Sequence, residues 1–191
     1  MKKALYFVTA CCFAVSCFAQ EHLSFMGIPI TGTITSFQNK LIAKGCKLSK
    51  IDNQLPTGIR GFKGVFAGKD CNIYVWYNHR SKVVYSVRAV TDSNETIEQA
   101  HNTFYYFKNL LIQKYDGIAL TSDMLDVVKE TEYEFELLIL QQPIKDDART
   151  IGHISVHIID YDGLQATHSV AVTYTDYDNS SKNEQNTIDD L

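Results

Sequence analysis

The sequence predicts an α+β fold built from two units, each a helix followed by antiparallel strands, with the helices packed on one side of a largely antiparallel sheet. Two observations carry this prediction. Apolar residues recur at helical spacing over 34–41 and 97–115, and they alternate with a period of two in the segments after each. Gly, Asn, Asp and Ser bound the alternating runs. The predicted order is α-β-β-β-β-α-β-β-β, which suggests duplication of one unit.

The first unit opens with a short apolar stretch, residues 23–30, in which Pro29 restricts any strand to a sheet edge. Thr33 is the expected cap of a helix, and Gly45 lies where a left-handed residue ends one. The apolar stripe of this helix consists of Ile34, Phe37 and Leu41. Four strands are predicted to follow, at 47–51, 59–68, 71–78 and 83–91.

The second unit begins with the longest helical pattern in the chain. We expect Asp92 or Ser93 to cap this helix and Asp116-Gly117 to end it. Its stripe consists of Ile97, Ala100, Phe104, Phe107, Leu111 and Tyr115. A short helical turn is predicted at 122–130. A strand at 133–139 follows, because its apolar residues alternate with glutamates.

The last two strands are predicted to form a hairpin around Tyr161-Asp162-Gly163. A two-residue loop would place Ile158 opposite Thr167, which mixes apolar and polar side chains on one face. A three-residue loop with Gly163 in the left-handed conformation pairs Asp160 with Leu164 and Ile158 with Ala166 instead. We therefore predict the three-residue loop.

The first nineteen residues resemble a signal peptide for export. Lys2 and Lys3 precede an uncharged apolar run at 4–14, which is too short to span a bilayer as a helix. Cleavage is expected between Ala19 and Gln20, and the alternative is a lipoprotein anchored through Cys17. We predict one domain at 20–177, with possible halves at 20–91 and 92–177, and a polar, mobile tail at 178–191.

Composition narrows the range of partners. Removal of residues 1–19 would take two lysines with it, and the formal net charge would change from −4 to −6. An acidic chain is a poor match for nucleic acid, which we therefore exclude as a partner. Cys46 and Cys71 would be the two cysteines left, and an exported chain with an even pair favours one disulfide between them. The alternative is two buried free thiols.

No arrangement of residues predicts catalysis, a metal site or a cofactor. His153 and His157 have the spacing of zinc ligands on a helix, but four residues of strand separate them by about 13 Å. They are better interpreted as outward-facing strand histidines. His168 is expected opposite Val156 on the apolar face, as a hydrogen-bonded core histidine. Segment 160–163 resembles the start of a calcium loop without its later ligands, and 64–70 fails the spacing of a phosphate-binding loop.

The strongest candidate for function is an aromatic sheet face. Tyr74 and Trp76, the only tryptophan, alternate with apolar residues and so lie on one side of the strand at 71–78. If Tyr77 pairs with Val83, Tyr74 lies opposite Ser86, and Arg88 falls on the same side. Tyr, Trp and Arg dominate binding hot spots. The alternative is that the tail, the 23–30 segment or the second unit covers this face.

Two stretches together carry a resemblance to known proteins: Phe25-Met26-Gly27-Ile28-Pro29-Ile30-Thr31-Gly32-Thr33 and Arg60-Gly61-Phe62-Lys63-Gly64-Val65-Phe66-Ala67-Gly68. With Asp176-Tyr177-Asp178-Asn179 and the closing Asp189-Asp190-Leu191, they resemble small secreted proteins of unknown function from Bacteroidales bacteria. This resemblance implies export and no activity. The repeated helix-then-sheet order is also similar, more loosely, to the β-lactamase-inhibitor-protein fold, whose members bind proteins on an aromatic-studded sheet. That similarity is one of architecture, which does not fix function.

The first functional hypothesis is a non-enzymatic binding module. It would be exported to the periplasm or secreted, and would hold a protein, peptide or glycan on the face that carries Tyr74, Trp76 and Arg88. A second hypothesis is a hydrolase with a cleft between the two halves, using His168 and nearby aspartates. A third is a structural subunit of an envelope assembly.

Overall fold

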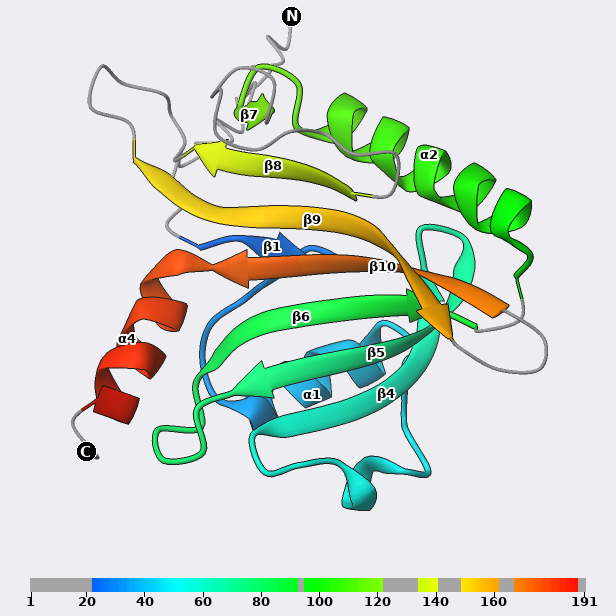
Figure 1. Ribbon diagram of the computed structural model, residues 1–191. Helices are drawn as coiled ribbons and strands as arrows, with labels where there is room; N and C mark the ends of the chain where they lie inside the picture. The colour runs from blue at the N-terminus through cyan, green and yellow to red at the C-terminus, as the bar shows by residue number, and fades with distance from the viewer. Residues whose placement is uncertain (1–21, 93–94, 122–133, 141–148, 162–166, 189–191) are drawn as a thin grey trace, which may run out of the picture.

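The described residues form one eight-stranded antiparallel sheet. The computed structural model describes residues 22–92, 95–121, 134–140, 149–161 and 167–188. The strand order is β3-β4-β5-β6-β10-β9-β8-β7 (Figure 1). The strands are β3 (Lys47–Leu48), β4 (Ile59–Phe66), β5 (Lys69–Tyr77), β6 (Val84–Thr91), β7 (Ala119–Thr121), β8 (Glu134–Leu140), β9 (Thr150–Tyr161) and β10 (Thr167–Asp176). The predicted α+β class is confirmed.

The helices and a small hairpin complete the fold. A two-stranded sheet, β1 (Ser24–Phe25) and β2 (Ile28–Pro29), precedes α1 (Ile34–Ala43). A short 3-10 helix lies at Asp52–Gln54, and α2 (Ile97–Lys114) follows β6. The described chain ends in α4 (Tyr177–Ile188). Within the described residues, no helix is both long and apolar enough to cross a membrane.

The sheet consists of two four-stranded meanders joined edge to edge. α1 precedes the meander β3–β6 and α2 precedes the meander β7–β10. Five residue pairs between β6 and β10, from Ser86 opposite Thr175 to Val90 opposite Ala171, join the two meanders. Strand β7 is absent from the sequence prediction, because three residues are too few to show alternation.

The hydrophobic core lies between one face of this sheet and α1, α2 and the β1–β2 hairpin. Phe37 and Leu41 of α1 and Phe107 of α2 are buried there. Phe25 of the hairpin stacks on Phe66 of β4 with ring centroids 5.0 Å apart. Figure 1 shows α1 behind β4 and β5, so the viewer looks at the opposite face of the sheet, which neither α1 nor the hairpin covers.

Capping side chains fix the first residues of α1 and α2. The Thr33 hydroxyl accepts a hydrogen bond from the Ser36 amide, which confirms the predicted cap of α1. The cap of α2 is Thr96, so the prediction of Asp92 or Ser93 is wrong. Thr96 and Gln99 exchange hydrogen bonds between their side chains and amides, a capping box that satisfies two amides at the helix start.

The register of the β9–β10 hairpin differs from the predicted one. Ile158 pairs with Val170 rather than with Ala166, and Thr167 opposite Tyr161 is the last pair of the ladder. Residues 162–166 make the connection and lie outside the described residues. The shift of four residues keeps the same side chains on the core face. It also brings Val172 opposite Val156 and Tyr174 opposite Ile154, so that large buried side chains meet.

The polar C-terminal segment is a helix and not the tail that composition predicts. Asn179 of α4 is buried, and its side-chain amide donates to the Ile30 carbonyl. Asp176 accepts a hydrogen bond from the Asn179 amide and so caps the helix. The predicted signal segment at 1–19, the alternative anchor at Cys17 and the predicted turn at 122–130 lie outside the described residues.

The predicted disulfide between Cys46 and Cys71 is wrong, because both cysteines are free thiols. Cys71 of β5 pairs with Gly64 of β4, and Cys46 lies on the other side of Gly64. Two strand spacings, about 9.5 Å, exceed the Cα separation that a disulfide allows. Burial raises the pKa of Cys46 and raises that of Cys71 to about 12. The two thiols are therefore buried and unreactive.

Candidate binding face

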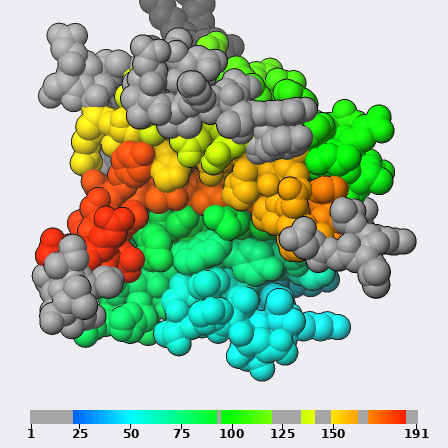
Figure 2. All heavy atoms as spheres, in the orientation of Figure 1, coloured from blue at the N-terminus to red at the C-terminus, as the bar shows by residue number. Residues whose placement is uncertain are grey.

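The sheet face opposite α1 and α2, called the open face below, carries Tyr74, Trp76 and Arg88, which sequence analysis singles out. Register places Tyr74, Arg88 and Thr173 side by side in one row across β5, β6 and β10. The side chains of β10 on this face are all small: Ser169, Ala171, Thr173 and Thr175. Ser169 and Ala171 are fully buried, whereas Thr173 and Thr175 line one of the hollows described below. Figure 2 shows the open face from the side of Figure 1.

Tyr74, Trp76 and Arg88 lie on the open face, each partly buried. Tyr74 pairs with Arg88 and Trp76 with Ser86, so the predicted pairing of Tyr74 with Ser86 is two residues out of register. A β-bulge between Trp76 and Tyr77 and a longer turn account for the difference. A shift of two residues leaves every side chain on its predicted face.

Arg88 is held in place by its neighbours. Its guanidinium lies over the Trp76 ring, 5.3 Å from the centroid, and its Nε donates to the Thr173 hydroxyl at 2.9 Å. The Tyr74 ring lies beside that of Trp76, with centroids 6.2 Å apart. Burial lowers the pKa of Arg88 from its ordinary value, although an arginine remains charged at neutral pH. The face thus presents a fixed, partly desolvated cation.

Two hollows adjoin the Arg88–Trp76 pair. One, of about 420 Å³, lies over Tyr74 and has Leu55 and Tyr161 among its walls. The other, of about 330 Å³, is lined by Tyr85, His153 and several Ser and Thr side chains. Both hollows share Trp76 and Arg88, so they lie next to each other on the open face, and the two together are called the sheet groove below.

A glycine shapes the wall of the sheet groove. Gly61 of β4 lies opposite Tyr74, and a Cβ at Gly61 would come within 2.9 Å of Leu55 Cδ1. The missing side chain lets the segment around the 3-10 helix fold over the edge of the open face. Asp52 fixes this segment by accepting a hydrogen bond from the Gly61 amide. The wall beside Tyr74 is therefore built into the fold.

The two strand histidines face the same way as the groove. His153 and His157 lie on the same side of β9, opposite Thr175 and Ala171 on the open face. Burial lowers the pKa of both, and Arg88 lowers that of His157 further while Glu134 opposes the shift. In the part of the chain that the structure describes, no three His, Cys, Asp or Glu side chains gather as metal ligands.

His168 lies at the start of β10, on the core side of the sheet. It is opposite Asp160 rather than Val156, and its Nδ1 is 2.7 Å from Asp160 Oδ1. Among the described residues, no hydroxyl or thiol is hydrogen-bonded to its ring. The ladder between β6 and β10 joins the two units, so they are not separated there by the cleft that the hydrolase hypothesis requires.

Sequence analysis misses Thr173, Leu55 and Tyr161 as parts of this face. Thr173 reaches Arg88 only because β10 pairs with β6, two strands far apart in the chain. Leu55 lies in an irregular segment with no periodic pattern, and Tyr161 ends a strand. Alternation along β10 shows the small side chains, and it is the one sequence signal that could have indicated a hollow.

Comparisons with protein-family models, with curated proteins and with solved structures found no match.

Proposed function

We propose that this protein is an exported, non-enzymatic binding module that holds a protein or peptide in the sheet groove. The observation that carries the proposal is the pre-oriented guanidinium of Arg88, which lies over the Trp76 ring on the sheet face opposite α1 and the β1–β2 hairpin. Export rests on the signal-like pattern at residues 1–19. A ligand outside the cytoplasm is accordingly expected.

Arg88 indicates the chemistry of the ligand. A guanidinium has five N–H donors, and Arg88 uses its Nε–H on Thr173. Among the described residues, no carboxylate forms an ion pair with it. Glu136 shares its row but lies three strand spacings away, about 14 Å. A partly buried arginine that forms no ion pair with the described residues favours a carboxylate as ligand, because a carboxylate could bind its two terminal nitrogens in bidentate fashion.

The groove favours a polypeptide over a glycan. Sugars stack on open aromatic faces, whereas Arg88 already lies over the Trp76 ring. The two hollows adjoining Arg88 are lined by both apolar and hydroxyl side chains, as pockets for the side chains of a peptide are. Tyr, Trp and Arg together are also the residues enriched at the centre of protein interfaces.

The experiment uses Trp76 as an internal reporter, since it is the only tryptophan of the chain. A displayed library of ten-residue peptides is selected on the intact protein, and binding is measured by Trp76 fluorescence and by calorimetry. Selected peptides should be rich in Asp and Glu. They should lose roughly 30-fold in affinity with Arg88→Gln or Tyr74→Ala, the usual loss at a hot spot.

The matched controls are Tyr105→Ala and Tyr106→Ala. Both tyrosines are exposed on α2, away from the open face, and these variants should bind peptides like the wild type. A folded Tyr74→Ala/Trp76→Ala variant that still binds the selected peptides, measured by calorimetry, would refute the proposal. If neutral sugars bind to this face and no peptide does, the ligand of the protein is a glycan rather than a polypeptide.

One observation favours a second candidate, a hydrolase whose site lies at His168 rather than in a cleft between the two units. The Asp160 carboxylate, 2.7 Å from His168 Nδ1, would orient the imidazole as in a histidine that acts as a general base. Its test is hydrolysis of p-nitrophenyl acetate by the wild type and by His168→Gln. Equal rates for the two proteins would remove this candidate.

A further inference from the structure

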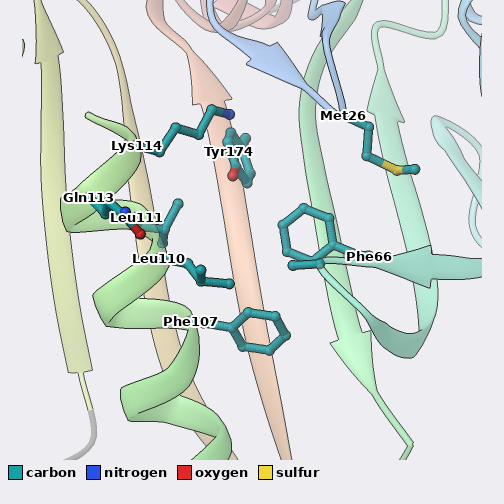
Figure 3. A pocket seen from close by; sticks show the side chains of 9 residues that line it. Met26, Phe66, Phe107, Leu110, Leu111, Gln113, Lys114 and Tyr174 are labelled. Atoms are coloured by element: carbon teal, nitrogen blue, oxygen red, sulfur yellow. The ribbon is translucent and has the colours of Figure 1, made fainter. Parts of the chain in front are cut away.

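A second pocket, independent of the sheet groove, lies on the helix side of the molecule. It has a volume of about 430 Å³ and is bounded by the second half of α2, Tyr174 of β10 and the tips of two hairpins, β1–β2 and β4–β5. Figure 3 shows Phe107 and Leu110 of α2 on one side of it and Phe66 and Met26 on the other. This volume is in the range of small-molecule sites, and the walls are mainly apolar as in such sites.

The two hairpin tips adopt a conformation that places side chains at the pocket. Met26 and Ala67 have positive φ angles of 52° and 47°, and each precedes a glycine that also has positive φ. Two successive residues of this kind make a type I′ turn, whose first position favours Asn, Asp or Gly. Met26 therefore holds a disfavoured backbone conformation at a position that lines the pocket.

Lys114 gives the pocket its polarity. It is the only charged residue among the described residues that line the pocket, and Figure 3 shows its amine beside the Tyr174 ring. Nζ lies 4.7 Å from the Tyr115 ring centroid and 5.9 Å from that of Tyr174. Gln113 adds one amide. The pocket thus combines an apolar interior with a single cation and an amide.

We infer that this pocket binds a medium-chain fatty carboxylate, with its alkyl chain between the two hairpin tips and α2 and its carboxylate at Lys114. The apolar walls bury the methylenes, and the one positive charge selects an anionic head over a neutral or cationic one. This inference does not depend on the proposed function of the sheet groove, because the two sites lie on opposite faces of the sheet.

The first test is calorimetric titration with octanoate, decanoate and dodecanoate, each below its micellar concentration. Affinity should rise about fourfold per added methylene, until the pocket is filled. Dodecanoate should bind at one site and about tenfold more tightly than dodecanol, and dodecylamine should bind more weakly still. Failure of dodecanoate to bind, or equal binding of the three head groups, would overturn the inference.

Variants locate the site. Leu110→Glu places a charge in the pocket and should abolish binding, while Ile112→Glu is the matched control. Leu110 and Ile112 are exposed to similar extents, 37% and 42%, on the same helix, but Ile112 does not line the pocket. Lys114→Met should weaken dodecanoate about tenfold and leave dodecanol unchanged. Equal effects of the two glutamate substitutions would refute the assignment, and unchanged dodecanoate binding by Lys114→Met would remove the role of that lysine.

Discussion

Substitution of Asp176 should destabilise the fold more than that of any exposed acid, because its carboxylate joins the two ends of the described chain. Asp176 is fully buried at the end of β10. Its oxygens accept hydrogen bonds from the Leu23 amide at 3.0 Å and from the Asn179 amide at 3.1 Å. The His22 ring lies 3.1 Å away. One side chain therefore holds the N-terminal segment and caps α4.

The expected cost follows from the groups left without partners. Asp176→Ala would leave the amides of Leu23 and Asn179 without an acceptor, at about 1–3 kcal/mol for each buried donor. For the two donors together we expect the low half of the summed range, about 3 kcal/mol in total. Asp176→Asn keeps one acceptor oxygen and should cost about half as much.

The assay is urea unfolding followed by the fluorescence of Trp76. The matched control is Asp178→Ala, because Asp178 forms an exposed ion pair with Arg149 and should contribute about 0.5 kcal/mol. The order of stability should be wild type, Asp178→Ala, Asp176→Asn, Asp176→Ala. If Asp176→Ala unfolds within 0.5 kcal/mol of Asp178→Ala, the claim that Asp176 joins the two ends is wrong.

Three further predictions test the sheet and its buried groups. Burial lowers the pKa of His157 below 6.5, so the unfolded chain binds this proton more tightly. The contribution of His157 to the free energy of unfolding should therefore be greatest above about pH 6.5 and fall on acidification. The urea midpoints at pH 8 and pH 5 should then differ less for His157→Gln than for the wild type. Gly152→Ala should cost about 2 kcal/mol or more in urea unfolding, because its Cβ would clash with the Thr175 carbonyl oxygen; a neutral substitution would contradict this. Alkylation of the denatured, unreduced protein should label both Cys46 and Cys71, and a reductant should leave its stability unchanged; a disulfide found by mass spectrometry would contradict the structure.

Local pattern was enough to predict most elements. The helix capped by Thr33 and the strands β4, β5 and β6 lie within a few residues of their predicted bounds, because period and turn residues are local properties. The same alternation placed Tyr74, Trp76 and Arg88 on one face. This assignment of faces is correct although the register was predicted wrongly in two hairpins, because shifts of two or four residues keep every side chain on the same face of the sheet.

Interactions between distant segments decided the rest. The tail was predicted from polarity alone, but α4 depends on Asp176 and on contacts with the start of the chain. The disulfide was predicted from cysteine parity, whereas the intervening strand β4 keeps the two thiols apart. The length of the loop between β9 and β10 could not be predicted either, because registers that differ by an even number of residues all place the same side chains on the core face.

The sequence by itself determined the fold class, the main elements and the face on which the aromatic side chains lie, because these depend on spacing within a segment. The tertiary structure alone decided that β6 pairs with β10, which puts Thr173 beside Arg88 and small side chains at the middle of the open face. It also brought two hairpin tips against α2 to enclose the apolar pocket. Both sites depend on contacts between segments that are far apart in the chain, and no single segment specifies which distant partner it meets.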